Sequence, residues 1–318
     1  FSGKIFSLRW LTSFYNLGEK IFNVFLTLLC LFAIFNMISF LKALNKSEKK
    51  LTHLDHREVK LSYGKVTYLD HGNSENILLS VHGLYGGYDQ AFNNLKDFSD
   101  TYRIIAPSRF GYLGSDIKGN GSPEEQVSSF IELLNHLNID KVFVVGTSAG
   151  GTVAIKFALD HPERCRGLIL YSSASPWDKK PNHVPKRLGP PEFLNNNIAM
   201  WLISPFFDQT MGMKPSTIYQ MFPIDKRAKG VNIDSDITNR DMAVNFNDYR
   251  IEDLKVPTLI IHSEDDKVAP YSAPQGHVKQ SLYRYPRLTK KIFKNGGHLM
   301  EGHGAEIKKT VKKFVEEN

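Results

Sequence analysis

The chain has 318 residues, of which 42% are hydrophobic and 23% are charged, and its formal net charge is +7. This length and this ordinary composition favour one large globular domain and exclude disordered and repeat architectures. Five of the seven net positive charges lie in residues 1–60, a distribution that argues against nucleic-acid binding and favours an anionic membrane surface near the N-terminus.

An uncharged apolar run lies near the N-terminus. The run IFNVFLTLLCLFAIFNMISFL (21–41) would rise about 31 Å as a helix, which is close to the hydrocarbon thickness of a bilayer. We therefore expect one transmembrane helix at 21–41, within a membrane anchor and linker that comprise residues 1–50. A buried core helix is the alternative. A cleaved signal peptide is disfavoured, because the run is longer than the apolar region of a signal peptide and no A-x-A cleavage site follows it.

Basic residues flank this run on both sides. Four lysines at 42–50 follow it, and three basic residues at 4–20 precede it. Because the more positive flank of a membrane helix tends to remain in the cytoplasm, this difference favours a cytoplasmic position for the rest of the chain.

From about residue 57, short β-branched runs alternate with helical patterns. Two runs around Gly64, at 59–63 and 65–72, alternate polar and apolar residues and predict an antiparallel hairpin at a sheet edge. Several later runs lack this alternation, as is typical of central parallel strands covered on both faces. Further strands are expected at 77–81, 102–107, 141–146, 167–173, 258–263 and 288–294.

Helices are predicted between these strands. Ser122, Pro123 and Glu125 supply an N-cap, a first-turn proline and a capping-box glutamate, and the apolar residues after them fall on one helix face. Strands separated by helices imply an α/β protein with a doubly wound, mostly parallel sheet. Further helices are expected from Ser148 to about residue 161, at about 272–283 and at about 304–316.

Residues 174–252 interrupt this alternation. They contain no convincing strand, many prolines and several aromatic residues. Because the stretch is too long for a loop, we expect it to form an inserted helical lid within a domain of residues 51–318.

The sequence VVGTSAGG (144–151) follows a predicted strand and opens a predicted helix. Small residues around Ser148 permit a sharp, strained turn that would expose its hydroxyl above the sheet, as in the G-x-S-x-G nucleophile elbow. A glycine-rich turn without a catalytic role has the same local pattern. The interpretation therefore depends on whether the chain also supplies a base, an acid and oxyanion donors.

The sequence VHGLYGG (81–87) follows another predicted strand. Attack on a carbonyl requires two N–H donors that point at the developing oxyanion. The backbone N–H groups of Leu84 and Ala149 are the candidates, and Tyr85 is a secondary one. His82 is expected to orient this loop rather than to act as a base.

Two later motifs supply the acid and the base. In HSEDDKVAP (262–270), Asp266 is preferred as the acid over Asp265 and Glu264. In NGGHLMEGH (295–303), two glycines present His298 at a loop tip, whereas His303 is expected at the surface or behind the site. The order Ser, Asp, His, with each residue after its own strand, indicates a catalytic triad.

These motifs, together with APSRFGYLGS (106–115), resemble the landmarks of the α/β-hydrolase superfamily in order and spacing, over about residues 58–316. The lipase, esterase and C–C hydrolase branches are included in this resemblance. With its N-terminal run, the chain looks like the membrane-anchored monoacylglycerol lipase and esterase types. Ser108 stands where the family often has Asp. A serine at 148 rather than an aspartate argues against the dehalogenase and epoxide hydrolase branches.

The resemblance implies catalytic roles for Ser148, Asp266 and His298 and oxyanion-hole roles for Leu84 and Ala149. The expected function is that of a membrane-anchored, single-pass serine hydrolase that cleaves a lipid-like carboxylic ester. Hydrolysis of a soluble substrate, including C–C bond hydrolysis, and ligand sensing remain as alternatives. No cofactor or metal is expected, because the sequence has no Cys/His cluster at ligand spacing and no P-loop lysine.

Overall fold

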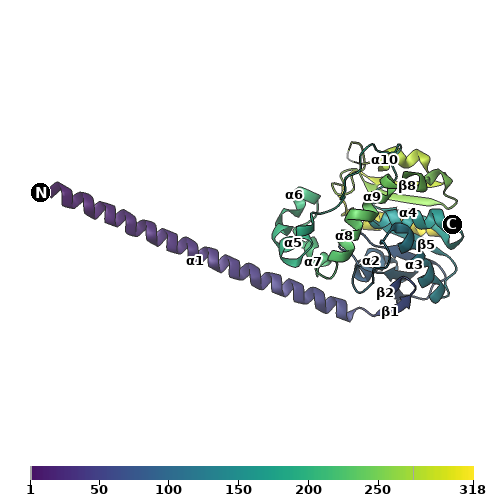
Figure 1. Ribbon diagram of the computed structural model, residues 1–318, viewed down its shortest axis with the longest axis horizontal. Helices are drawn as coiled ribbons and strands as arrows, with labels where there is room; N and C mark the ends of the chain where they lie inside the picture. Colours follow the sequence, from purple (N-terminus) through teal and green to yellow (C-terminus); the bar gives the residue numbers. More distant parts are fainter. Residues whose placement is uncertain (1, 275) are drawn as a thin grey trace.

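An eight-stranded sheet lies at the centre of the globular body, in the order β1-β2-β4-β3-β5-β6-β7-β8 (Figure 1). The computed structural model describes residues 2–274 and 276–318, with side chains at Tyr15 and from Leu17 onward. Strand β2 pairs antiparallel with β1 and β4, and the other pairs are parallel. The predicted doubly wound sheet with an edge hairpin is confirmed. The strands are β1 (His56–Leu61), β2 (Gly64–His71), β3 (Ile77–Val81), β4 (Arg103–Pro107), β5 (Val142–Thr147), β6 (Cys165–Tyr171), β7 (Thr258–Ser263) and β8 (Leu288–Phe293).

Helices cover both faces of this sheet. Phe130 and Phe157 are buried in the apolar core on one face, and Leu95 and Phe314 are buried in the core on the other. The central strands therefore contact apolar side chains in both directions, which explains why their sequences do not alternate. The covering helices are α3 (Pro123–His136) and α4 (Gly150–Asp160) on the first face, and α2 (Tyr88–Leu95) and α11 (Gly304–Glu316) on the second.

Local sequence signals placed some helices better than others. The capping box of α3 is present, with the Ser122 side chain and the Glu125 backbone N–H 3.2 Å apart. The predicted helix at 272–283 is wrong over its first half, because among the described residues of this range only those of α10 (Val278–Ser281) are α-helical. Pro274 cannot donate a backbone hydrogen bond and disfavours helical dihedrals at the preceding residue. Helix α2 was not predicted, since its sequence YDQAFNNL spans only 8 residues, which is too short to repeat a helical period clearly.

Helix α1 (Ser2–His53) is longer than the predicted span of 21–41. The expected linker at 42–50 is helical, because Ala43, Ser47 and Leu51 are buried against the body on one face of the helix. The N-terminal part projects from the body as a free rod (Figure 1). Residues Leu17–His53 form a helix that is long and apolar enough to cross a membrane.

The segment between β6 and β7 contains only helices, turns and loops among its described residues. Helix α7 contacts α1, and the first three helices of the segment lie at the end of the body beside α1 (Figure 1). Their apolar side chains form a cluster that includes Met200, Phe207, Met221 and Phe222 and that we call the insertion cluster. The helices are α5 (Asn197–Ile203), α6 (Phe207–Met211), α7 (Ile218–Met221), α8 (Ala228–Ile233) and α9 (Asn239–Val244), with a π-helical turn at Asp234–Thr238.

Two buried ion pairs join this segment to the loop after β4 and to the first turn of α2. The Arg109 guanidinium bonds both carboxylate oxygens of Asp234, one of them at 2.5 Å. The Arg227 guanidinium bonds both carboxylate oxygens of Asp89 at 3.0 and 2.9 Å. Burial opposes the charge on Arg109, but the Asp234 carboxylate outweighs it, so the pKa of Arg109 is raised above its ordinary value.

The Arg109–Asp234 pair generates a stability prediction. Asp234→Asn should lower the free energy of unfolding by about 3–5 kcal/mol, because it leaves the buried arginine charge without its counter-ion. Chemical denaturation of the detergent-solubilised protein measures this loss.

The matched control is Asp236→Asn, two residues away. Asp236 pairs with Arg187 at 2.8 Å, but its side chain is partly exposed, so the loss should not exceed about 1 kcal/mol. Equal losses in the two variants would contradict a special role for the buried pair.

Candidate active site

Ser148 lies in the tight turn between β5 and α4. Its φ is +52°, which is unusual for a residue with a side chain. Its neighbours must be glycine because a Cβ on Gly146 would lie 2.6 Å from the Ala154 Cβ, and one on Gly150 would lie 2.2 Å from the Val81 carbonyl oxygen. The turn therefore holds a strained, half-buried serine at the carboxyl edge of the sheet.

The structure brings Ser148, His298 and Asp266 together in one hydrogen-bonded series. The Ser148 Oγ lies 3.0 Å from His298 Nε2, and His298 Nδ1 lies 2.8 Å from Asp266 Oδ2. Because a carboxylate only accepts, the imidazole proton is on Nδ1, which leaves Nε2 free to accept from the serine hydroxyl. This is the arrangement that a general base needs beside a nucleophile.

Asp266 is fixed by the loop that follows β7. Its Oδ1 accepts hydrogen bonds from the backbone N–H groups of Val268 and Ala269 at 2.8 and 2.9 Å. The residue is buried, and its second oxygen faces His298. The carboxylate is thus held in one orientation, with no freedom to turn away from the imidazole.

The neighbouring acids have other partners. Asp265 Oδ1 accepts from the Gly297 N–H at 2.9 Å and from the Ser263 hydroxyl, so it ties the β7 loop to the loop that carries His298. Burial alone would raise the pKa of Asp265, but these hydrogen bonds outweigh it and the pKa is lowered. Glu264 pairs with Lys294 at 3.0 Å, and neither acid hydrogen-bonds His298.

The candidate oxyanion donors flank the serine. Among the described residues, no acceptor is recorded for the backbone N–H of Leu84 or of Ala149. A Cβ on Gly83 would lie 2.9 Å from the Ser148 Cβ, so the loop after β3 passes directly beside the serine. Two unpaired N–H groups near one nucleophile can stabilise an oxyanion that forms there.

His82 and Tyr85 hold this loop in place. His82 Nε2 accepts from the Arg109 N–H at 3.0 Å and its Nδ1 donates to the Gly83 carbonyl at 2.8 Å, so both ring nitrogens are used by the backbone. Burial, reinforced by the Arg109 charge, lowers the pKa of His82 well below its ordinary value. The Tyr85 hydroxyl donates to Asn195 in the inserted segment at 2.9 Å. Both side chains therefore act on loop geometry.

Three residues near the site were not singled out from sequence. Arg109 and Arg227 bond the His82 and Gly86 carbonyls at 2.8 and 2.6 Å. His262 Nε2 lies 3.5 Å from Asp266 Oδ2 and donates to the Ala269 carbonyl at 2.8 Å. Arg109 follows a predicted strand in APSRFG, and this position could have marked it as a candidate site residue. Arg227 could not have been found in this way, because its partner Asp89 is distant in sequence.

His303 is placed away from the serine, as expected. Its ring stacks on Phe293 with centroids 4.0 Å apart, and its Nε2 lies 3.0 Å from the Asn295 carbonyl. Within the described residues, no group of three or more His, Cys, Asp or Glu side chains is arranged to hold a metal ion.

Comparisons with known proteins find a match to the alpha/beta hydrolase fold and similarity to several hydrolases. The family model of the alpha/beta hydrolase fold matches residues 76–199. Lipase 1 of Psychrobacter immobilis is 24% identical over 234 residues, which cover 70% of this chain and 72% of the lipase. A 2-hydroxy-6-oxononadienedioate/2-hydroxy-6-oxononatrienedioate hydrolase of Paraburkholderia phymatum is also 24% identical, over 76% of this chain and 87% of that protein.

A solved structure extends the likeness. The crystal structure of a membrane phospholipase A, a bacterial virulence factor, matches with a TM-score of 0.65 and 17% identity, over 93% of this chain and 99% of its own. At this identity the match shows the fold alone. The family model and the sheet order together show that the chain has the α/β-hydrolase fold, and two kinds of hydrolase are among its relatives.

Proposed function

We propose that the protein is a serine hydrolase that cleaves a carboxylic ester, with Ser148, His298 and Asp266 as its catalytic triad. The observation that carries this proposal is the hydrogen-bonded series from the Ser148 Oγ through His298 to Asp266, with distances of 3.0 and 2.8 Å. It joins the three residue types of an acyl-enzyme mechanism in the required order.

The mechanism follows from the roles of these groups. His298 Nε2 accepts the Ser148 proton while Oγ attacks the acyl carbon, and the N–H groups of Leu84 and Ala149 bind the oxyanion that develops. The protonated His298 then donates to the leaving alcohol. Water, deprotonated by the same nitrogen, attacks the acyl-enzyme and releases the acid and Ser148. Asp266 keeps the tautomer and stabilises the imidazolium throughout.

A lipid-like substrate is favoured by the apolar surroundings of the oxyanion loop. Leu84 and Tyr85 pack with the insertion cluster, which contains the buried side chains of Met200, Met221 and Phe222. Met and aromatic side chains adapt to a flexible acyl chain. We infer that residues 174–252 act as a lid and that this cluster borders the acyl site.

The same proposal includes a membrane anchor. The uncharged run in α1 is exposed on all sides up to its contact with the body at Phe40, and only 6% of its most apolar window is buried. A core helix would be covered by the body, so the exposed run fits a lipid environment. The likeness to a lipase supports the ester hydrolysis that we propose beside this anchor.

A second candidate is hydrolysis of a soluble substrate, including C–C bond hydrolysis. The relative named for 2-hydroxy-6-oxononadienedioate hydrolysis is as similar in sequence as the lipase, at 24% identity. The series of acyl esters below distinguishes the two candidates.

The first prediction concerns the nucleophile and the base. Ser148→Ala and His298→Ala should each lower kcat by roughly three to six orders of magnitude, because either change removes the attack step. Ser148→Ala should also abolish labelling by a fluorophosphonate probe, measured by gel fluorescence. Ser173→Ala is the control, since Ser173 donates to the Ala174 carbonyl instead. Persistent labelling of Ser148→Ala would show that another serine reacts.

The second prediction separates the two adjacent aspartates. Asp266→Asn should lower kcat by about 10⁴-fold, because an amide at this position favours the wrong tautomer of His298. Asp265→Asn should lower kcat by less than about tenfold, because an amide oxygen still accepts a hydrogen bond from the Gly297 N–H. Rates on p-nitrophenyl acetate measure both. The opposite ranking would assign the acid to Asp265.

The third prediction concerns the acyl group. If the insertion cluster borders the acyl site, kcat/KM should rise from acetyl to medium-chain p-nitrophenyl esters, since each buried methylene contributes up to about 0.8 kcal/mol. Initial rates across the series from acetate to laurate test this. A steady fall beyond acetate would indicate a small, closed site and favour the soluble substrate.

A further inference from the structure

We propose that the inserted segment docks its outer apolar face into the same phospholipid bilayer that α1 crosses, so that the lid lies at the membrane interface. This inference rests on the proposed membrane anchor and goes beyond it, because it assigns a second contact with the bilayer. The docking face is formed by the exposed side chains of Phe193, Ile198, Leu202 and Phe206, which are 73%, 58%, 64% and 60% exposed.

The outer side of α5 and of the turn after it is apolar, and their polar residues Asn197 and Ser204 are buried. Met200 and Phe207 are buried in the insertion cluster, whereas Ile198, Leu202 and Phe206, spaced four residues apart, face outward. A surface helix of a soluble body normally carries polar residues on its outer side. An apolar outer face indicates an apolar environment that covers it.

The packing of α1 sets the depth of this face. Phe40, the second-last residue of the uncharged run, lies with its ring centroid 6.0 Å from those of both Trp201 and Phe222. When residues 21–41 fill the hydrocarbon core of about 30 Å, their last turn lies at its boundary. Trp201 is then held at this boundary, and α5, to which it belongs, lies there as well.

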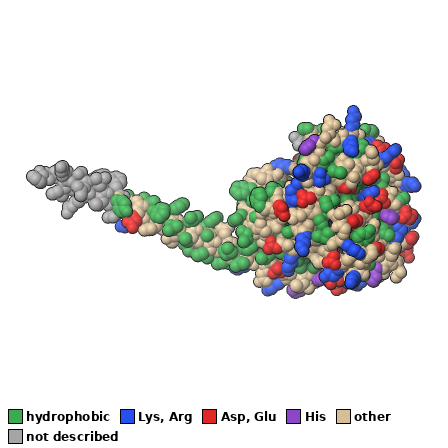
Figure 2. All heavy atoms as spheres, in the orientation of Figure 1, with side chains coloured by type: hydrophobic (Ala, Val, Ile, Leu, Met, Phe, Trp, Pro, Cys, Tyr) green, Lys and Arg blue, Asp and Glu red, His purple; other side chains and the backbone are tan. Residues whose placement is uncertain are grey.

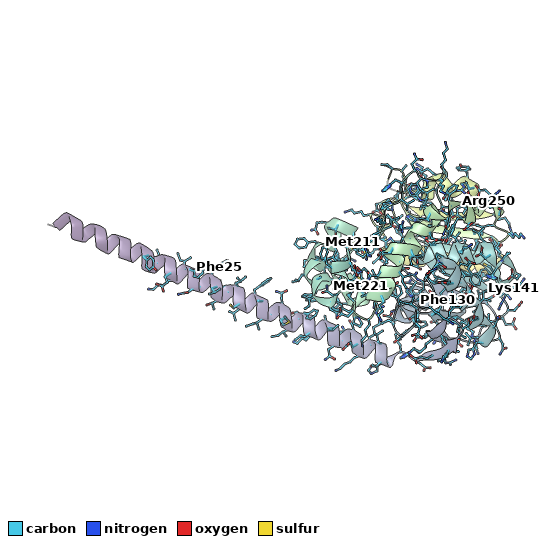
Figure 3. The ribbon with its side chains drawn as sticks, viewed as in Figure 1. Phe25, Phe130, Lys141, Met211, Met221 and Arg250 are labelled. Atoms are coloured by element: carbon cyan, nitrogen blue, oxygen red, sulfur yellow. The ribbon has the colours of Figure 1, made fainter. Side chains whose placement is uncertain are left out.

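The junction between α1 and the insertion is built from further contacts. The Ser47 hydroxyl donates to the Tyr219 carbonyl at 3.4 Å, and Glu48 pairs with Lys226 at 3.2 Å. Figure 3 shows Met221 in the part of the body beside α1, and Phe25 on the free part of the helix. These contacts couple the anchor to the lid, so the orientation of one fixes the orientation of the other.

The chemistry along α1 matches the layers of a bilayer. The exposed apolar run ends at Leu41, Trp201 and Tyr219 lie beside its end with centroids 6.3 Å apart, and exposed lysines follow at 42, 46 and 49. Aromatic rings favour the membrane interface, and lysines favour anionic headgroups. Figure 2 shows hydrophobic side chains along α1 and again on the side of the body from which its free part projects. This continuity selects a bilayer rather than a second protein as the occupant.

The first test measures contact directly in the full chain. A Leu202→Cys variant carrying an NBD fluorophore, in a Cys30→Ser background, is reconstituted into phosphatidylcholine–phosphatidylglycerol vesicles that contain nitroxide-labelled acyl chains. The native Cys165 is buried, and burial raises the pKa of its thiol to about 12, so it does not compete for the label. Tyr283→Cys is the control, because Tyr283 is 79% exposed and belongs to no part of the docking face.

The label at 202 should be quenched by the nitroxide lipids, and the label at 283 should not. Equal, weak quenching at both positions in carbonate-resistant protein would overturn the docking face and leave the anchor intact. Release of the wild-type protein by carbonate would instead overturn the anchor and this inference with it. A crosslink between two copies of the Leu202→Cys variant at this cysteine, without quenching, would show that the face mediates self-association and would also refute the proposal.

The second test links the contact to lipid substrates. Leu202→Glu should lower the rate on a long-chain ester embedded in vesicles by roughly tenfold or more, because a charge opposes immersion of the apolar face. Hydrolysis of p-nitrophenyl acetate in solution should be unchanged, as should both rates in the control Tyr283→Glu. Unchanged rates on the vesicle ester in Leu202→Glu would refute the proposal. If the wild-type protein hydrolysed neither of the two esters, the proposed hydrolase function would be refuted, whereas the quenching result would still stand.

Discussion

The candidate site depends on the contacts of one buried residue, Arg109. Its Nε donates to the His82 carbonyl at 2.8 Å, its backbone N–H donates to His82 Nε2, and its Nη atoms bond Asp234. One residue thus joins the loop after β3, the loop after β4 and the inserted segment. Because a charge this deeply buried requires a counter-ion and full hydrogen bonding, its partners have little freedom to move.

Arg227 constrains the other end of the same loop. It bonds Asp89 and the Gly86 carbonyl, and thereby holds the end of the loop that begins at His82. The backbone of Leu84 lies between these two fixed points. Preorganised N–H groups stabilise a developing charge without reorganisation during the reaction, so the two arginines give the candidate oxyanion loop the rigidity that its proposed role requires.

Burial also lowers the pKa of two histidines near the site, His82 and His262. For His262 it does so even though the nearby Asp266 carboxylate acts in the opposite direction. Both rings therefore stay neutral, and the Asp266 charge is left to face His298. The contact of Phe40 with Trp201 joins the apolar helix α1 to the inserted segment. The proposed acyl site and the proposed membrane anchor are thereby linked through one packed cluster.

Local sequence determined much of this protein, and the reason is that the relevant signals are short-range. Periodicity and β-branching predicted the strands and their positions along the chain, the capping box predicted the start of α3, and the spacing of small residues around Ser148 predicted the strained turn. The order of Ser148, Asp266 and His298 also grouped three residues whose side chains lie within hydrogen-bonding distance. The tertiary structure alone decided which oxygen faces His298, that Asp265 instead holds Gly297, and that α1 continues through residues 42–50. It alone paired Arg109 with Asp234 and Arg227 with Asp89, because these partners lie 125 and 138 residues apart, and no local pattern specifies contacts across such distances.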